Sequence, residues 1–198
     1  MSRTRAQDFD QKKIAIRSVA TGLFSKVGFH ATSMTQVAEA AGISKGLLYH
    51  YYQNKDFLLF DILETHLSDL AEDVENAASK CMDPEEKLNS IIEALLDNYH
   101  DCDDEHRIQV AEMSSLPIAQ QETLRNLERR IVTPVNHAVS KMLPAEVSQN
   151  MMLKPCTMTL FGMVNWCFMW FKKDGLMSRS DYAKLVSQIF LNGIRSLP

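Results

Sequence analysis

Cationic, aromatic and small side chains gather in one short stretch of the 198-residue sequence, "AAGISKGLLYHYYQNKDFLL" (residues 40–59). Lys45 supplies positive charge, and Gly46 lets a backbone approach another surface closely. Tyr49 adds a flat ring and a hydroxyl, and His50 adds a ring N–H. Such groups suit contact with phosphates and with the methyl group of thymine.

The charge of the chain is unevenly distributed. Residues 1–60 carry eight Lys and Arg against four Asp and Glu, a net charge of +4. The remainder carries 13 against 21, a net charge of −8. This asymmetry favours a polyanion as the partner of the first third only. Uneven solvated surface is the alternative.

Local signals divide the first third of the chain into short helices. Apolar residues at helical spacing run from residue 16 to 27, and Gly28 ends the helix. "SMTQ" (33–36) is a capping box that opens a second helix, which ends at Gly42. Ser44 is placed to cap a third helix that reaches residue 52. These signals predict two short helices, 33–41 and 45–52, joined by a glycine-containing turn.

The rest of the chain also reads as helical. Asn54 is placed to cap a long fourth helix, and "DPEE" (83–86) combines an N-cap aspartate with proline at the first helical position. Residues 151–172 are apolar nearly all round, which predicts a helix covered on every side. Ser178 with Asp181 opens the last helix. The fold class predicted is all-α, with about nine helices and domains at 1–55 and 56–198.

Two short helices joined by a tight turn make a helix-turn-helix, whose second helix enters the DNA major groove. We expect Tyr49 to face outward and Tyr51 and Tyr52 to be partly packed. For His50, a packed or solvent-facing ring is the alternative to a phosphate contact. Residues expected to touch DNA are Ser33, Thr35, Lys45, Gly46, Leu47, Tyr49, His50 and Lys55.

The segment "GFHATSMTQVAEAAGISKGLLYHYYQNKDFLL" (28–59) resembles the DNA-binding head of the TetR family of ligand-responsive transcriptional repressors. The resemblance implies that Ser33 caps the second helix and touches phosphate, and that Lys55 anchors the start of the fourth. It assigns the recognition surface to Lys45, Gly46, Tyr49 and His50. Leu47, where a small residue often stands, departs from the pattern and leaves base preference open.

The same resemblance implies a ligand cavity in the body and a homodimer formed by the last two helices. Candidate ligand-binding residues are Tyr99, Met113, Met158, Phe161, Asn165, Trp166 and Met169. Candidate dimer residues are Phe168, Phe171, Ile189, Phe190, Gly193 and Ile194. Aromatic and methionine stripes are also common in plain protein cores. Residues 161–183 resemble family members that respond to acyl-coenzyme A thioesters, which favours that type of effector.

Other functions have weaker support in the sequence. No GxSxG, Walker or HExxH motif occurs, so we expect no enzyme, no metal and no cofactor. The acidic run "DCDDEH" (101–106) is a hydrated linker or a metal site. Arg3, Arg5, Lys12 and Lys13 form either a solvated tail or a minor-groove arm. An activator and a protein-binding adaptor remain alternatives, and reduced cytosol fits four scattered cysteines without a membrane span.

Overall fold

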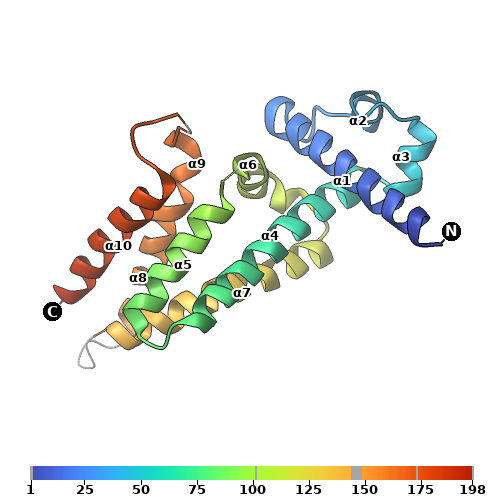
Figure 1. The fold of residues 1–198 in the computed structure, drawn as a ribbon. Helices are drawn as coiled ribbons and strands as arrows, with labels where there is room; N and C mark the ends of the chain where they lie inside the picture. Colours follow the sequence, from blue (N-terminus) through green and yellow to red (C-terminus); the bar gives the residue numbers. More distant parts are fainter. Residues whose placement is uncertain (1, 101, 144–148, 173, 198) are drawn as a thin grey trace. The chain divides into compact units, whose positions relative to one another are not determined.

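The structure, a computed structural model, describes the backbone of residues 2–100, 102–143, 149–172 and 174–197, and the side chains of residues 7–100, 102–143, 151–172 and 174–197. All regular structure in these ranges is helical (Figure 1). The elements are α1 (Ser2–Val27), α2 (Met34–Ala40), α3 (Lys45–Tyr51), α4 (Lys55–Lys80), α5 (Pro84–Asn98), α6 (Asp103–Glu112), η1 (Met113–Ser115), α7 (Ile118–Met142), α8 (Gln149–Asn165), α9 (Cys167–Trp170) and α10 (Arg179–Arg195). The all-α prediction is therefore confirmed.

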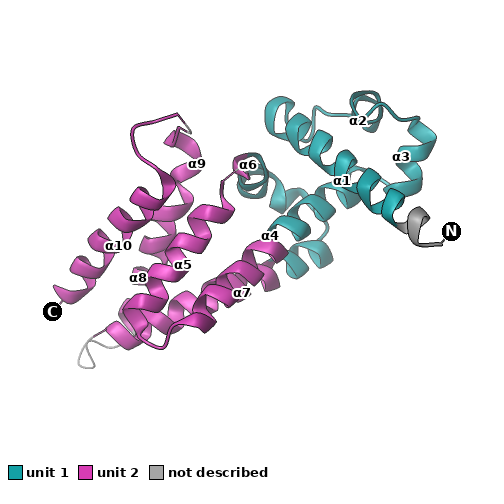
Figure 2. Ribbon diagram, viewed as in Figure 1, with its two compact units in different colours: residues 1–66, 104–124 teal, residues 67–103, 125–198 magenta. Residues whose placement is uncertain are grey.

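The chain forms two compact units (Figure 2). Unit 1 comprises residues 1–66 and 104–124, and unit 2 comprises residues 67–103 and 125–198. Helices α4 and α7 each contribute residues to both units. Unit 1 thus contains residues 104–112 of α6 in addition to the three N-terminal helices, and Asp103 of α6 belongs to unit 2. The functional division at residue 55 stays a prediction.

Unit 1 is built around an apolar core that fixes α2 and α3. Val37 and Leu48 are fully buried, Ala38 of α2 is also buried, and α2 packs against α3. Between the two helices, Gly42 adopts a φ of +65°, a left-handed conformation that costs glycine little and other residues more. The turn therefore holds α3 in one orientation on the core.

Unit 2 packs α10 against α5 and α8. The predicted helix starts are present, since Asp83 accepts hydrogen bonds from the backbone N–H groups of Glu85 and Glu86. Ser178 likewise accepts one from the N–H of Asp181. Buried apolar residues of α5 form much of the core, namely Leu88, Ile91, Ile92, Leu95 and Leu96. None of the described helices is both long and apolar enough to cross a bilayer.

The prediction that residues 151–172 form a helix covered on every side was wrong for the single chain. Helix α8 gives way at Trp166 to the four-residue helix α9. One side of the segment faces solvent and includes Met158, Trp166 and Met169. Because this exposed side is apolar, it suits contact with another apolar surface.

Candidate nucleic-acid interface

Side-chain caps set the two helices of the predicted helix-turn-helix. Ser33 Oγ accepts a hydrogen bond from the backbone N–H of Gln36 at 3.2 Å, and the side chain of Gln36 accepts one from the N–H of Ser33 at 2.8 Å. This is the predicted capping box of α2. Ser44 caps α3 by accepting a hydrogen bond from the N–H of Leu47 at 3.2 Å. Both helix starts are therefore fixed locally.

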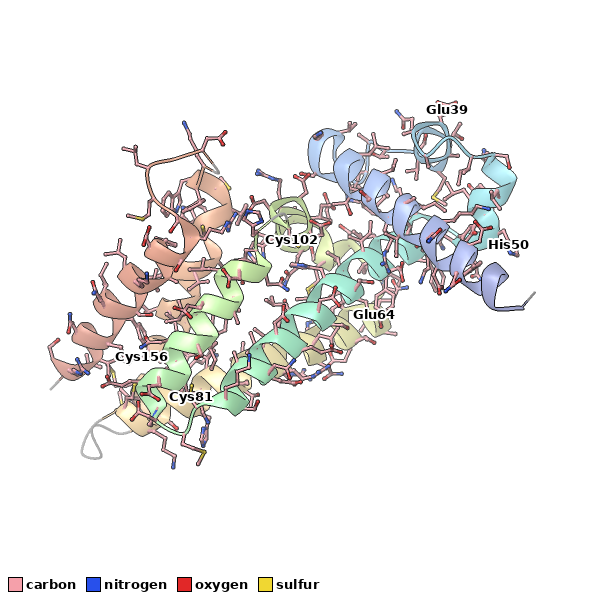
Figure 3. The ribbon with its side chains drawn as sticks, viewed as in Figure 1. Glu39, His50, Glu64, Cys81, Cys102 and Cys156 are labelled. Atoms are coloured by element: carbon pink, nitrogen blue, oxygen red, sulfur yellow. The ribbon has the colours of Figure 1, made fainter. Side chains whose placement is uncertain are left out.

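The face of α3 that the sequence singles out is open to solvent. Lys45, Gly46, Tyr49 and His50 are all exposed, and Tyr49 retains 44% of its accessible surface. Figure 3 shows the side chain of His50 projecting from α3. Lys45 Nζ lies 5.9 Å from the ring centroid of Tyr49, a cation–π contact one helical turn away. The helix thus presents charge and a flat ring together.

The residues that flank this face differ in their exposure to solvent. Ser33 and Thr35 are exposed at the start of α2, whereas Leu47 is half-buried. Tyr51 stacks on Phe9 with ring centroids 4.6 Å apart, and Tyr52 is only 3% exposed. The predicted division of the tyrosines, Tyr49 outward and the other two packed, is confirmed.

Lys55 is engaged within the protein. Its Nζ donates hydrogen bonds to the carbonyl oxygens of Phe29 at 2.6 Å, His30 at 3.2 Å and Thr32 at 2.8 Å. The ammonium also lies 4.5 Å from the centroid of the Phe29 ring. An ammonium has three donors, so these bonds leave none for a phosphate. Lys55 thus anchors the start of α4 to the loop before α2, and the geometry argues against the expected phosphate contact.

The basic N-terminal residues belong to a helix. Because α1 begins at Ser2, neither a loose tail nor an extended arm describes this segment. Lys12 pairs with Asp8 at 2.9 Å along α1, and Lys13 pairs with Asp61 at 2.7 Å. The side chains of Arg3 and Arg5 lie outside the described residues.

Asp61 is a residue that the sequence analysis missed. Its carboxylate accepts hydrogen bonds from Lys13 Nζ at 2.7 Å, Tyr52 Oη at 2.7 Å and Arg17 Nη1 at 3.4 Å. These partners lie 48, 9 and 44 residues away in the sequence. No local pattern signals such a meeting point, because only the folded head brings the groups together.

The predicted ligand-binding residues lie in different surroundings. Tyr99 is buried, and its hydroxyl donates a hydrogen bond to Asn165 Oδ1 at 2.7 Å. Burial raises the pKa of Tyr99, so the hydroxyl stays protonated. Phe161 is buried in the same unit, and Met113 belongs to unit 1. By contrast, Met158, Trp166 and Met169 are exposed. Their assignment to an enclosed cavity is therefore inconsistent with the single chain.

The predicted dimer residues also differ in their exposure to solvent. Ile189 is 54% exposed and Gly193 is exposed, whereas Phe190 and Ile194 are only 5% and 4% exposed. Those two fill the core of unit 2 because their face of α10 meets its neighbouring helices. Phe168 and Phe171 are half-buried, and the Arg179 guanidinium lies 4.9 Å above the Phe171 ring.

Unit 2 carries an open groove of about 540 Å³ beside α4 and α5. None of the predicted ligand-binding residues lines it. Its lining is Asp73, Asn76, Ala77, Lys80, Ser90, Glu93, Ala94, Asp97 and Asn98. Within the described residues, which omit Asp101, no group of three or more His, Cys, Asp and Glu side chains is placed to hold a metal ion.

The architecture defines a helix-turn-helix protein, and comparison with known proteins gives its family. Residues 16–62 match the sequence model described as bacterial regulatory proteins, tetR family. Residues 81–194 match the tetracyclin repressor-like C-terminal domain. The chain belongs to the TetR family and is a DNA-binding transcriptional regulator. The family consists of non-enzymatic proteins, in agreement with the sequence prediction.

Similar proteins match nearly the whole chain. The transcriptional regulator AcrR of Shigella flexneri is 26% identical, covering 96% of this chain and 94% of its own. A TetR-family regulator from Bordetella parapertussis has a TM-score of 0.86 at 29% identity, covering 94% of this chain and 97% of its own. AibR, solved with isovaleryl coenzyme A and operator DNA, has a TM-score of 0.77 at 24% identity, covering 90% and 97%. At that identity the likeness to AibR concerns the fold.

Proposed function

We propose that this regulator is a repressor whose N-terminal head binds operator DNA and whose C-terminal body binds a small molecule that releases it. The observation that carries the proposal is the exposed face of α3, on which Lys45, Tyr49 and His50 stand out from a helix held by a capped start and a buried core. A short cationic helix of this kind fits the major groove.

Each exposed group has a chemical role in the proposal. Lys45 and Tyr49 face base edges, and Gly46 allows the backbone of α3 to approach the groove. Ser33, Thr35 and His50 reach phosphates on either side through hydroxyls and a ring N–H. These phosphate contacts set register, whereas the contacts from α3 set sequence preference.

A second copy of the chain provides the paired heads that two half-sites require. The two-fold dimer in this proposal covers exposed residues of α8, α9 and α10, helices that pack against one another in the order α9, α8 and α10. The covered residues are Met158, Gly162, Trp166, Met169, Leu185, Ile189 and Gly193. Cβ atoms built at Gly162 and Gly193 meet nothing within 4 Å, so both sites leave room for close helix approach. This reassigns Met158, Trp166 and Met169 from the cavity to the interface.

The effector in this proposal is apolar or an acyl-coenzyme A thioester. The hydrogen-bonded pair Tyr99 and Asn165, with Phe161 buried in the same unit, supplies polar and apolar groups for such a molecule. AibR, which has the same fold, was solved with isovaleryl coenzyme A and operator DNA. That complex supports the choice of an acyl-coenzyme A thioester as the effector to be tested.

Helix α6 offers a route by which the effect of ligand binding is transmitted to the head. Within unit 1, Ser25 Oγ donates a hydrogen bond to Asp104 Oδ1 at 2.6 Å, which ties α1 to α6. His30 Nε2 lies 3.4 Å from Glu112 Oε2 at the end of α6. A molecule that binds more tightly to one arrangement of α6 shifts the population of head positions accordingly.

Operator release is the test of this function. A promoter fragment is bound by the dimer, and isovaleryl, medium-chain and long-chain acyl-coenzyme A thioesters are added, with free coenzyme A and free fatty acids as controls. Release together with a raised Tm by a thioester, and by neither control, supports the proposal. No release and no thermal shift by any thioester at saturation removes the acyl-coenzyme A assignment.

Two alternatives predict other outcomes. A protein-binding adaptor shows no salt-dependent retardation of promoter DNA, whereas a repressor loses affinity steeply as salt rises. An activator binds the same DNA but raises reporter transcription. Tyr49→Ala serves as the matched control, because it removes an exposed ring from α3 and leaves the core of unit 1 untouched.

A further inference from the structure

A single carboxylate joins the recognition helix to the two helices that carry it. Asp61, on α4, accepts the hydroxyl hydrogen of Tyr52 at 2.7 Å and the ammonium of Lys13 at 2.7 Å. Arg17 Nη1 lies 3.4 Å from the same carboxylate and donates a second bond, of 2.7 Å, to Thr65 Oγ1 on α4. Tyr52 is the C-cap residue of α3, so the network holds the carboxyl end of that helix.

The position of Asp61 distinguishes it from a surface acid. Its side chain is 15% exposed, compared with 62% for Asp8, which also pairs with a lysine in the head. Burial, and secondarily the bond to Asp61, raise the pKa of Tyr52. The Tyr52 hydroxyl therefore remains a donor, and the carboxylate accepts one hydrogen bond from a neutral group and two from cations.

The placement of this negative charge has an electrostatic cost for DNA binding. Its single negative charge lies beside Lys13 and Arg17, two of the eight cations in residues 1–60, and offsets one of their two positive charges in a head that must approach phosphates. A charge-neutral residue there would strengthen attraction to any DNA. A geometric role would offset this cost, because a fully hydrogen-bonded polar network can hold the elements that it joins in one arrangement.

We propose that Asp61 is a positioning residue for operator recognition, which holds α3 in its reading orientation against α1 and α4 and lowers attraction to unrelated DNA. The proposal rests on DNA recognition by α3. Asp61 itself touches no base or phosphate in this account. It acts through Tyr52 on the recognition helix and through Lys13 and Arg17 on α1.

The test compares Asp61→Asn with the parent on two DNA fragments of equal length, the footprinted operator and a scrambled sequence, at one salt concentration. We expect operator affinity to fall about tenfold and affinity for scrambled DNA to rise about twofold to threefold. Asp8→Asn is the matched control, because it removes the same charge from an exposed pair within α1. It should raise both affinities slightly and leave their ratio unchanged.

If circular dichroism shows that Asp61→Asn does not fold, the variant Tyr52→Phe still tests the proposal. This variant removes only the hydroxyl that reaches Asp61 and leaves both ion pairs in place. Operator affinity should fall while affinity for scrambled DNA stays the same. If each of these two variants that folds keeps the parental ratio of operator to scrambled affinity, the proposal is overturned. A parent protein that does not distinguish the two fragments refutes instead the proposed function.

Discussion

Replacing Lys55 by methionine separates an internal anchor from a phosphate contact. Methionine keeps most of the length and apolar surface of lysine but removes three hydrogen bonds to the carbonyls of Phe29, His30 and Thr32. A hydrogen bond from a charged group contributes about 1.5–3 kcal/mol, but these three share one ammonium and one accepting carbonyl is exposed. We therefore expect Lys55→Met to lower the free energy of unfolding by about 2–4 kcal/mol in total.

Thermal melting followed by circular dichroism measures this loss, which corresponds to a fall in Tm of roughly 5–15 °C for a chain of this size. Lys26→Met is the control, since Lys26 is an exposed head lysine at the end of α1 and its loss should cost less than about 1 kcal/mol. Operator binding supplies the second readout. The affinity of Lys55→Met should fall with an unchanged slope of log affinity against log salt, because no phosphate contact is lost.

The opposite result would refute the anchoring role of Lys55. If the ammonium binds phosphate, Lys55→Met keeps the parental Tm and the salt slope decreases by about 0.9. The anchoring role and the phosphate contact therefore predict different results for both the Tm and the salt slope of Lys55→Met.

Three further variants test separate features. Ile189→Glu should convert the dimer to monomers in size-exclusion chromatography, whereas Ile118→Glu, at an 80% exposed site in unit 1, should not; equal behaviour contradicts the interface. Gly42→Val should destabilise the chain by about 1–2 kcal/mol in thermal melting, because valine disfavours a φ of +65°, while Gly46→Ala should not. Burial, and secondarily His106, lower the pKa of His66 from 6.5 to about 4, so only the unfolded chain binds this proton between those values. Stability should fall by up to about 3 kcal/mol as pH drops from 6.5 to 4, and His66→Gln should flatten that dependence in urea titrations; an unchanged slope would contradict it.

The boundaries of α2 and α3 could be predicted because their causes are local. The capping box at Ser33, the cap at Ser44 and the glycine at position 42 each act within a few residues of themselves. The exposed state of Tyr49 followed from the same register. The sequence near each helix end is therefore sufficient to predict these features.

The division between core, cavity and interface could not be predicted, because it depends on which neighbours a face meets. Ile189 and Phe190 are adjacent and both apolar, yet Ile189 is exposed and Phe190 is buried in the core of unit 2. Periodicity alone marks the apolar faces of a helix without saying what covers each one. The resemblance implied that Lys55 anchors the fourth helix, but the carbonyl partners of Lys55 could not be predicted, since they lie 23 to 26 residues earlier in the sequence.

The account depends most on α3 reading the major groove, and methylation interference on the upstream DNA of its own gene tests this directly. Methyl groups on guanine N7 lie in the major groove and block a helix that enters it. We predict interference in two half-sites with centres about one helical turn, roughly 34 Å, apart, and loss of retardation in Tyr49→Ala. Binding that is insensitive to N7 methylation and equal in the parent and Tyr49→Ala would contradict the account.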